Sequence, residues 1–239
     1  MRAFALVAIL LLGFHTAALS AAELVEYSAR YTASANGLKA SATRTLAKTR
    51  DGLYQLSNHL VAEFAGAQLA SLNESSVFAA ADSTLQPQSY SYALRGIGRE
   101  SKAIIFDWDT LVALSSEDLN SWSLPLTANT QDPLSYQAAL QIMLAQADLR
   151  EVSVPIVDGD RIDIQRFRIE GEEILLTPVG QLNCSKLVRV RDDESKSTTI
   201  WLAKDWNFLL VKIEQVSSGI SIVLELESAT LGGEVVAGQ

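Results

Sequence analysis

The sequence contains few of the residues from which metal and nucleophile sites are built. It has one cysteine, Cys184, and two histidines in 239 residues. A lone cysteine cannot form an internal disulfide. Only one histidine, His59, lies outside the first 22 residues, and one cysteine with one histidine cannot complete a zinc site. Cys184 stands at an alternate position with Leu182, which is typical of a small buried side chain. We therefore expect no metal and no cofactor, and we interpret Cys184 as a core residue.

Positive charge is also scarce. The chain has 19 Lys and Arg against 28 Asp and Glu, which gives a formal net charge of −9, and no basic run is longer than two residues. Nucleic acids and anionic membrane surfaces are bound through clusters of Lys and Arg that displace counterions. The charge balance therefore argues against either of them as the main partner.

Long apolar runs are absent beyond the first residues. No segment reaches the roughly 18 consecutive apolar residues of a membrane-spanning helix, so we expect no stable membrane span. Arg2 precedes an apolar segment at residues 3–14, and small residues follow at 17–22, which is the pattern of a secretory signal peptide. No cysteine follows this segment to accept a lipid anchor. We expect residues 1–22 to be removed on export, and we expect the mature protein to lie in a bacterial periplasm.

Catalytic motifs are missing as well. The sequence has no Gly-x-Ser-x-Gly and no Gly-rich phosphate loop, and it offers no Ser, His and Asp arrangement that indicates a nucleophile. Asp107 and Asp109, which flank Trp108, could hold a divalent cation or act as an acid pair. A calcium site needs about six or more oxygen ligands, so we prefer a polar turn around an anchoring tryptophan.

What the sequence does have is an alternation of apolar and polar residues. In residues 23–33, Val25, Tyr27, Ala29 and Tyr31 occupy every second position, as in a half-buried strand. Similar segments, separated by Gly, Asp, Asn and Pro, recur to the end of the chain. We expect strands at residues 23–33, 38–49, 52–64, 67–80, from about Pro87 onward, and at 99–108, 110–115, 122–126, 152–157, 161–170, 173–176, 182–191, 197–203, 207–215 and 220–229. No linker or repeat interrupts them, so we expect a single β-rich domain at 23–231 and a flexible tail at 232–239.

One segment has helical spacing instead. Asp132 can cap a helix, Pro133 suits its first position, and apolar residues then recur up to Leu149. The sequence therefore predicts one helix at residues 133–149. The predicted fold is mainly β: an antiparallel meander that forms a curved open barrel or sandwich, with the helix packed on its concave side.

Short motifs along the chain resemble those of a family of exported bacterial proteins of unknown function, DUF3108. The matching motifs are Phe106-Asp107-Trp108, Gln131-Asp132 with Leu134-Ser135, Val157-Asp158-Gly159, Gly171-Glu172-Glu173, Leu176-Thr177-Pro178-Val179-Gly180, Thr199-Ile200-Trp201-Leu202-Ala203 and Val211-Lys212-Ile213. Pro133 and Leu210 depart from the family pattern, which more often has a charged residue and a proline there. The resemblance implies a periplasmic β-rich protein and carries no catalytic residues. A looser likeness to the curved-sheet lipoprotein carriers of the periplasm is one of fold alone.

These observations favour a non-catalytic binding module for an apolar, lipid-like ligand. The ligand would lie in a cavity between helix and sheet, and the candidate lining residues are Trp108, Leu140, Met143, Leu144 and Trp201. The main alternative is a scaffold with a solid core that docks an envelope protein through exposed strand edges or through its aromatic turns. A third hypothesis is an enzyme that acts on envelope polymers through Asp107, Asp109 or His59.

Overall fold

A computed structural model describes residues 24–35, 38–81, 84–96, 98–193, 195–217 and 219–239. These residues form one sheet of 15 strands in the spatial order β8-β7-β6-β5-β4-β3-β2-β1-β14-β13-β12-β11-β10-β9, with β15 paired to β14. The end strands β8 and β9 are not neighbours, so the sheet curves without closing. The expected signal peptide at residues 1–22 lies outside the described residues.

Sequential strands pair with each other, and the first strand joins the last long one. The strands are β1 (Tyr27–Ala35), β2 (Leu38–Lys48), β3 (Tyr54–Phe64), β4 (Ala67–Ala81), β5 (Thr84–Gly96), β6 (Glu100–Asp107), β7 (Val112–Glu117), β8 (Asn120–Pro125), β9 (Glu151–Asp158), β10 (Arg161–Thr177), β11 (Gly180–Val190), β12 (Lys196–Ala203), β13 (Leu209–Ser217), β14 (Ile220–Leu231) and β15 (Glu234–Val235). Because β1 pairs with both β2 and β14, the two ends of the domain meet in the middle of the sheet.

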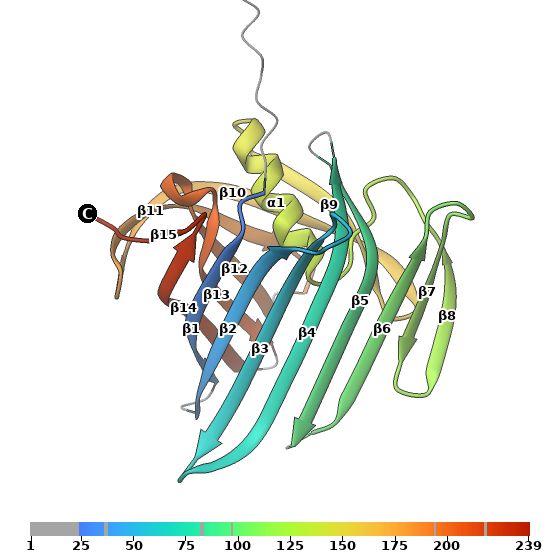
Figure 1. Cartoon of the computed structure of the whole chain (residues 1–239), viewed down its shortest axis with the longest axis horizontal. Coiled ribbons are helices and arrows are strands. Elements are labelled where there is room, and N and C mark those ends of the chain that lie inside the picture. The colour runs from blue at the N-terminus through green and yellow to red at the C-terminus, as the bar shows by residue number, and fades with distance from the viewer. Residues whose placement is uncertain (1–23, 36–37, 82–83, 97, 194, 218) are drawn as a thin grey trace, which may run out of the picture.

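The alternation that predicts the strands also sets which face is buried. In β1, the side chains of Tyr27, Ala29, Tyr31 and Ala33 are buried, while those between them are exposed. Figure 1 shows two walls around this buried face, one made by β1–β8 (the N-terminal wall) and the other by β9–β14 (the C-terminal wall). The curved antiparallel sheet with one helix on its concave side is confirmed.

The helix α1 (Ser135–Gln146) connects the walls and packs between them against β4, β5 and β9. Asp132 caps it from outside the helix proper, because its Oδ1 accepts hydrogen bonds from the backbone N–H groups of Leu134 and Ser135 at 2.8 and 2.7 Å. The helix is shorter at both ends than the predicted 133–149. A short 3₁₀ helix, η1 (Lys204–Trp206), follows β12. No helix among the described residues is long and apolar enough to cross a membrane.

Two segments differ from the sequence-based expectation. The strands expected at 161–170 and 173–176 form the single strand β10, because Gly171 at a φ of 112° is absorbed as a bulge instead of making a turn. The end of the chain, expected to be a flexible tail, adds β15 to β14 and buries Val236. The backbone of Gln239 also exchanges hydrogen bonds with that of Gln181, at 3.1 and 3.2 Å.

Candidate functional site

A row of polar side chains crosses the concave face of the N-terminal wall. Strand register places Arg44, Asn58, Glu74, Tyr92, Lys102 and Glu117 opposite one another, one from each strand of β2–β7. We call this row the polar belt. Each member occupies an inward position of its strand, where an apolar residue is usual. The belt therefore needs internal partners for its charges.

Hydrogen bonds join one end of the polar belt into a chain. The Nε of Arg44 donates to the Tyr27 hydroxyl at 2.8 Å, and its Nη1 donates to Asn58 Oδ1 at 3.1 Å. Asn58 Nδ2 in turn donates to one carboxylate oxygen of Glu74 at 2.9 Å, and the Tyr90 hydroxyl donates to the other at 2.8 Å. A buried guanidinium is thereby connected to a carboxylate through neutral partners.

Burial and these partners shift the pKa values of Arg44 and Glu74. Burial alone would lower the pKa of Arg44, but the nearby Tyr27, Tyr31 and Glu74 outweigh it and raise that pKa. Burial raises the pKa of Glu74 in spite of the hydrogen bonds from Asn58 and Tyr90. At this end of the belt the charged form of Arg44 is stabilised, whereas the charged form of Glu74 is destabilised by desolvation.

The other end of the polar belt lines a small polar pocket. The Nζ of Lys102 lies 3.0 Å from a carboxylate oxygen of Glu100 and 2.9 Å from one of Glu117. Burial would lower the pKa of Lys102, but these two carboxylates raise it. The pocket holds about 240 Å³ between these residues and the β9–β10 turn, where Gly159 approaches the Glu117 carboxylate so closely that a Cβ would stand 3.4 Å from it.

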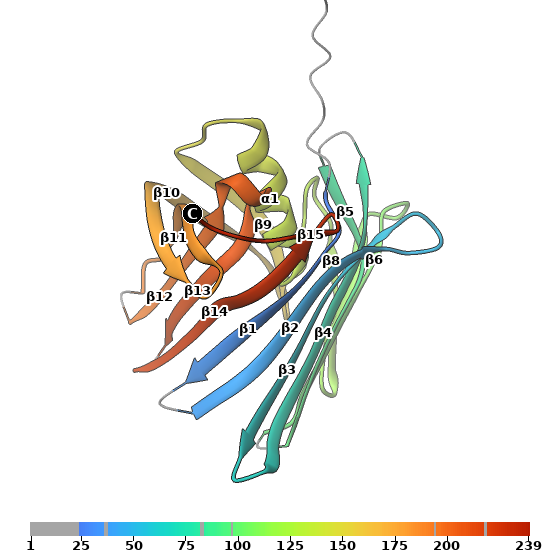
Figure 2. The same cartoon turned by 60° about the vertical axis from the view of Figure 1, so that its left-hand side comes forward.

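Burial of the concave face falls sharply across the polar belt. On the α1 side, the row Leu46, Leu56, Ser76 and Tyr90 is at most 4% exposed. On the far side, the row Ala42, Leu60, Leu72 and Leu94 leads from a buried alanine to partly buried leucines. Figure 2 shows that the strands of both walls extend well past α1 in this direction. The helix therefore covers only part of the concave face.

A second apolar row continues from the N-terminal wall onto the C-terminal wall. Its members pair in register in the order Ala70, Ala62, Ala40, Ala33, Leu224, Ile213, Ile200 and Leu187. Together with Ala42, Leu60, Leu72 and Leu94 these residues form what we call the apolar face. It is a contiguous apolar set on the concave side beyond the polar belt. Leu187 and Ile200 at one end are buried, whereas its leucines on β3–β5 are only partly buried.

A buried carboxylate fixes the helix to the N-terminal wall on the other side of the polar belt. Asp132 is fully buried, and its second oxygen accepts a 2.6 Å hydrogen bond from the Ser76 hydroxyl. Burial raises the pKa of Asp132 to about 6, although four hydrogen bonds act in the opposite direction. Tyr136, in the first turn of α1, stacks on Phe167 of β10, so the helix is held to both walls.

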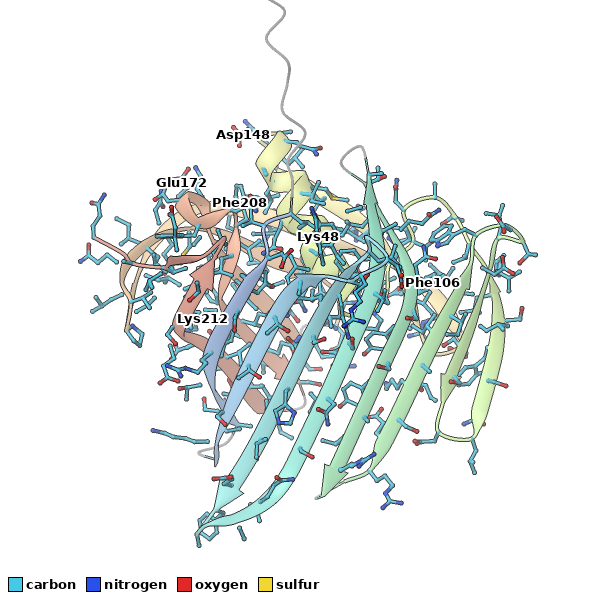
Figure 3. All side chains as sticks on the ribbon, in the orientation of Figure 1. Lys48, Phe106, Asp148, Glu172, Phe208 and Lys212 are labelled. Carbon is cyan, nitrogen blue, oxygen red and sulfur yellow. The ribbon has the colours of Figure 1, made fainter. Side chains whose placement is uncertain are left out.

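The five predicted lining residues do not gather around one pocket among the described residues. Trp108 lines a hollow of about 520 Å³ near Leu111 and Leu126, and its Nε1 donates to the Pro87 carbonyl at 2.6 Å. Leu144 lines another, of about 410 Å³, whose Asp148, Glu172 and Phe208 are seen near the end of α1 in Figure 3. Leu140 is buried, and Met143 packs half-buried against the core. Their role in binding stays a prediction.

Trp201 lies on a different face. It pairs with Lys186 and Lys212, whose ammonium groups stand 5.8 and 5.2 Å from its ring centre, and its Nε1 donates to Glu173 at 2.9 Å. Its neighbour Ile200 belongs to the apolar face, so Trp201 points away from it. On that face the two lysine ammonium groups make cation–π contacts with its ring, and Glu173 accepts its N–H.

The residues considered for catalysis make hydrogen bonds or are buried in ways that support the fold. Asp107 Oδ1 accepts hydrogen bonds from the backbone N–H groups of Thr110 and Asp109, which lower its pKa and close a turn. His59 is exposed, with Nδ1 2.8 Å from Asn73 Oδ1. Cys184 is buried, and burial raises its thiol pKa to about 12. No group of three or more His, Cys, Asp or Glu is placed to hold a metal in the part of the chain that the structure describes.

Sequence reasoning missed the polar belt. A signal was present, because Arg44 occupies the same strand parity as Ala42 and Leu46 and is therefore directed inward. What the sequence does not supply is the register that places Glu74 and Lys102 in the same row from other strands.

The fold and the site define a β-barrel-like protein whose single open sheet holds one helix on its concave side. The chain belongs to the DUF3108 family, described as proteins of unknown function, whose model matches residues 26–227. This confirms the resemblance carried by the short motifs. A search of curated proteins gave no match.

Solved structures are similar in fold. A β-barrel-like protein of the domain of unknown function DUF1849 from Brucella abortus has a TM-score of 0.57 and 10% identity, over 87% of this chain and 98% of that one. A putative lipoprotein from Parabacteroides distasonis has a TM-score of only 0.29 and 13% identity, over 86% and 95% of the two chains. The first likeness supports the fold alone, and the second is too weak to support an argument.

Proposed function

We propose that this protein binds an apolar, lipid-like ligand on the apolar face and catalyses no reaction. The observation that carries the proposal is the change of burial across the polar belt. Leu56 is completely buried, whereas Leu60 and Leu72, on the same face beyond the belt, are only partly buried. A protein leaves such a concave apolar surface open mainly where a ligand or partner covers it.

The predicted signal peptide supports a proposed location in the bacterial periplasm, where apolar molecules need a carrier to cross an aqueous space. The polar belt suits this function, because it separates the packed core from the open surface and stops an acyl chain from penetrating toward α1. The apolar residues then offer binding area without a specific reacting group.

The test is extraction of the purified native protein with organic solvent, followed by mass spectrometry, together with titration of a fluorescent hydrophobic probe. We expect a co-purified lipid and saturable probe binding. Replacing Leu60 and Leu72 by Asn should weaken probe binding by about tenfold or more, since burial of each leucine is worth about 1.5 kcal/mol or more. Ile105→Asn is the matched control, because Ile105 is 52% exposed and pairs with the exposed Leu114 outside this face. Absence of lipid, with equal probe binding by all variants, would refute the proposal.

A second candidate function, docking of an envelope protein, has its own observation. Beside the free edge strand β8, the side chains of Ile105, Leu114 and Leu119 are exposed by 52%, 55% and 101%. An unpaired edge next to apolar side chains can accept a strand from another protein. Crosslinking in cells should then capture one partner with the wild type and lose it with Leu114→Asp; recovery of the protein alone in both cases would count against docking.

A further inference from the structure

Two arginines of the C-terminal wall face the interior side by side. Arg189, on β11, pairs in register with Phe167, which is completely buried and stacks on Tyr136 of the helix. Arg191 follows two residues later, and its Nη2 donates to the buried Thr198 hydroxyl at 3.2 Å. Both guanidinium groups therefore lie on the concave side.

This pair has one N–H group that its described neighbours do not satisfy. Arg189 Nη2 donates to the carboxylate of Asp163 at 3.2 Å. Arg191 donates to the neutral hydroxyl of Thr198, while its Nε is buried and has no hydrogen-bond partner among the described residues. Burial and the neighbouring Arg191 lower the pKa of Arg189. Buried donors are nearly always paired in folded proteins, so an unpaired guanidinium N–H indicates a place for an acceptor.

The surroundings indicate which acceptor fits. Leu187, two residues before Arg189 on β11, is the buried end of the second row of the apolar face, and the row continues through Ile200 to the partly buried Ile213 and Leu224. The apolar row and the arginine pair therefore lie on the same side of one wall. A guanidinium fork matches the oxygens of a carboxylate or a phosphate. A molecule with both an acyl chain and such a headgroup complements the two surfaces at once.

We propose that Arg189, Arg191 and Thr198 form the headgroup subsite for an anionic amphiphile whose hydrocarbon chain lies on the apolar face. This inference rests on the proposed function and gives its ligand a chemical class: an acyl or alkyl chain that ends in a carboxylate or phosphate. Arg191 Nε supplies the unpaired donor, and Asp163 holds Arg189 in place beside it.

The experiment compares three ligands of equal chain length, namely dodecanoate, dodecyl phosphate and dodecanol, by displacement of the fluorescent probe from the full-length protein. We expect the wild type to bind at least one of the two anions about tenfold more tightly than dodecanol, the effect of one charge-assisted hydrogen-bonded pair. The anion with the larger preference identifies the headgroup as a carboxylate or a phosphate.

Arg191→Gln should abolish that preference and leave dodecanol binding unchanged. Arg191→Lys, which keeps the charge but loses the fork, should retain part of it, and retained dodecanol binding shows that each variant is folded. Arg168→Gln is the charge-matched control, because Arg168 is exposed and pairs with Glu170; it should behave as the wild type does.

The outcomes separate the two proposals. Equal binding of dodecanol and both anions by the wild type, or an anion preference that survives Arg191→Gln, would overturn the headgroup subsite and leave the apolar face standing. Failure of all three ligands to bind would overturn both proposals.

Discussion

Each wall of the sheet directs arginine side chains toward the concave side, but the two walls differ in how many of the arginine N–H groups find a hydrogen-bond acceptor. On the N-terminal wall, Arg44 donates to Tyr27 and Asn58, and Asn58 passes the connection to Glu74. On the C-terminal wall, Arg189 donates to Asp163 and Arg191 donates to Thr198, and the buried Nε of Arg191 has no partner among the described residues. We call the first network closed, because the hydrogen bonds lead from Arg44 to an internal carboxylate, and the second open, because one buried donor has no described acceptor. A closed network is typical of a group that supports the fold, whereas an open one leaves a donor for a ligand.

The largest effect should come from opening the closed network. Arg44→Met removes the cation that lowers the pKa of Glu74, and it leaves the hydroxyl of Tyr27 and the amide of Asn58 without their partner. We expect the free energy of unfolding to fall by about 3–5 kcal/mol, as for other broken buried charge networks. Urea denaturation measures it, with Arg161→Met as control because that side chain is 67% exposed. A loss below about 1 kcal/mol would show that the network does not support the fold.

The cost of burying acids near the N-terminal wall should also appear as a dependence on pH. The pKa of Asp132 is raised to about 6 and that of Glu74 is raised in the same direction. Asp132 in the folded protein therefore keeps a proton that the unfolded chain releases above about pH 4, so stability should fall as pH rises from about 4 to 6, by up to about 1.4 kcal/mol per pH unit. Glu74 should contribute in the same direction.

Asp132→Asn should remove much of this slope. Its amide oxygen can still accept from the N–H groups of Leu134 and Ser135, so the helix cap is kept while the titrating proton is lost. Denaturation series between about pH 4 and pH 7 make the comparison. An identical slope in both proteins would mean that Asp132 does not titrate in this range.

The alternation in the sequence is sufficient to predict the strands and the curved sheet, because each strand needs only its own residues to define a buried face. It fails at Gly171, where a turn and a bulge have the same local signal, and at the C-terminus, where Val236 finds its place only once β14 and β11 are in position. Both outcomes depend on neighbours that are distant in sequence.

The sequence predicts the apolar character of the candidate site but not the residues that form it. The pattern predicts an apolar concave surface, but it leads to a cavity between helix and sheet, whereas the apolar face lies beyond the polar belt. Aromatic residues were also expected to line the site, yet Trp201 packs between Lys186 and Lys212 on another face. The informative residues are charged ones at inward positions, such as Arg44 and Arg189. Their partners come from other strands, so only the register reveals whether the charge is paired.

A single hydroxyl in the closed network should have an intermediate effect. Tyr27→Phe removes the acceptor of the 2.8 Å hydrogen bond from Arg44 Nε and leaves that donor buried. We expect a loss of about 1–2 kcal/mol. Tyr54→Phe is the control, because the Tyr54 hydroxyl makes only a 3.4 Å contact with the Leu24 carbonyl and its removal should cost less. Equal losses would show that bond length is a poor guide to the closed network.

The smallest effect on stability is expected at the open site. Arg191→Gln removes a cation that crowds Arg189 and lacks a partner for its buried Nε, so the free energy of unfolding should change by less than about 0.5 kcal/mol or rise slightly. Urea denaturation without ligand, beside Arg44→Met under the same conditions, gives the direct comparison. A loss as large as that of Arg44→Met would make Arg191 a structural residue, and the distinction between a closed and an open wall would then fail. A neutral result leaves an arginine with a buried Nε that the fold does not need, which is what a ligand-binding group requires.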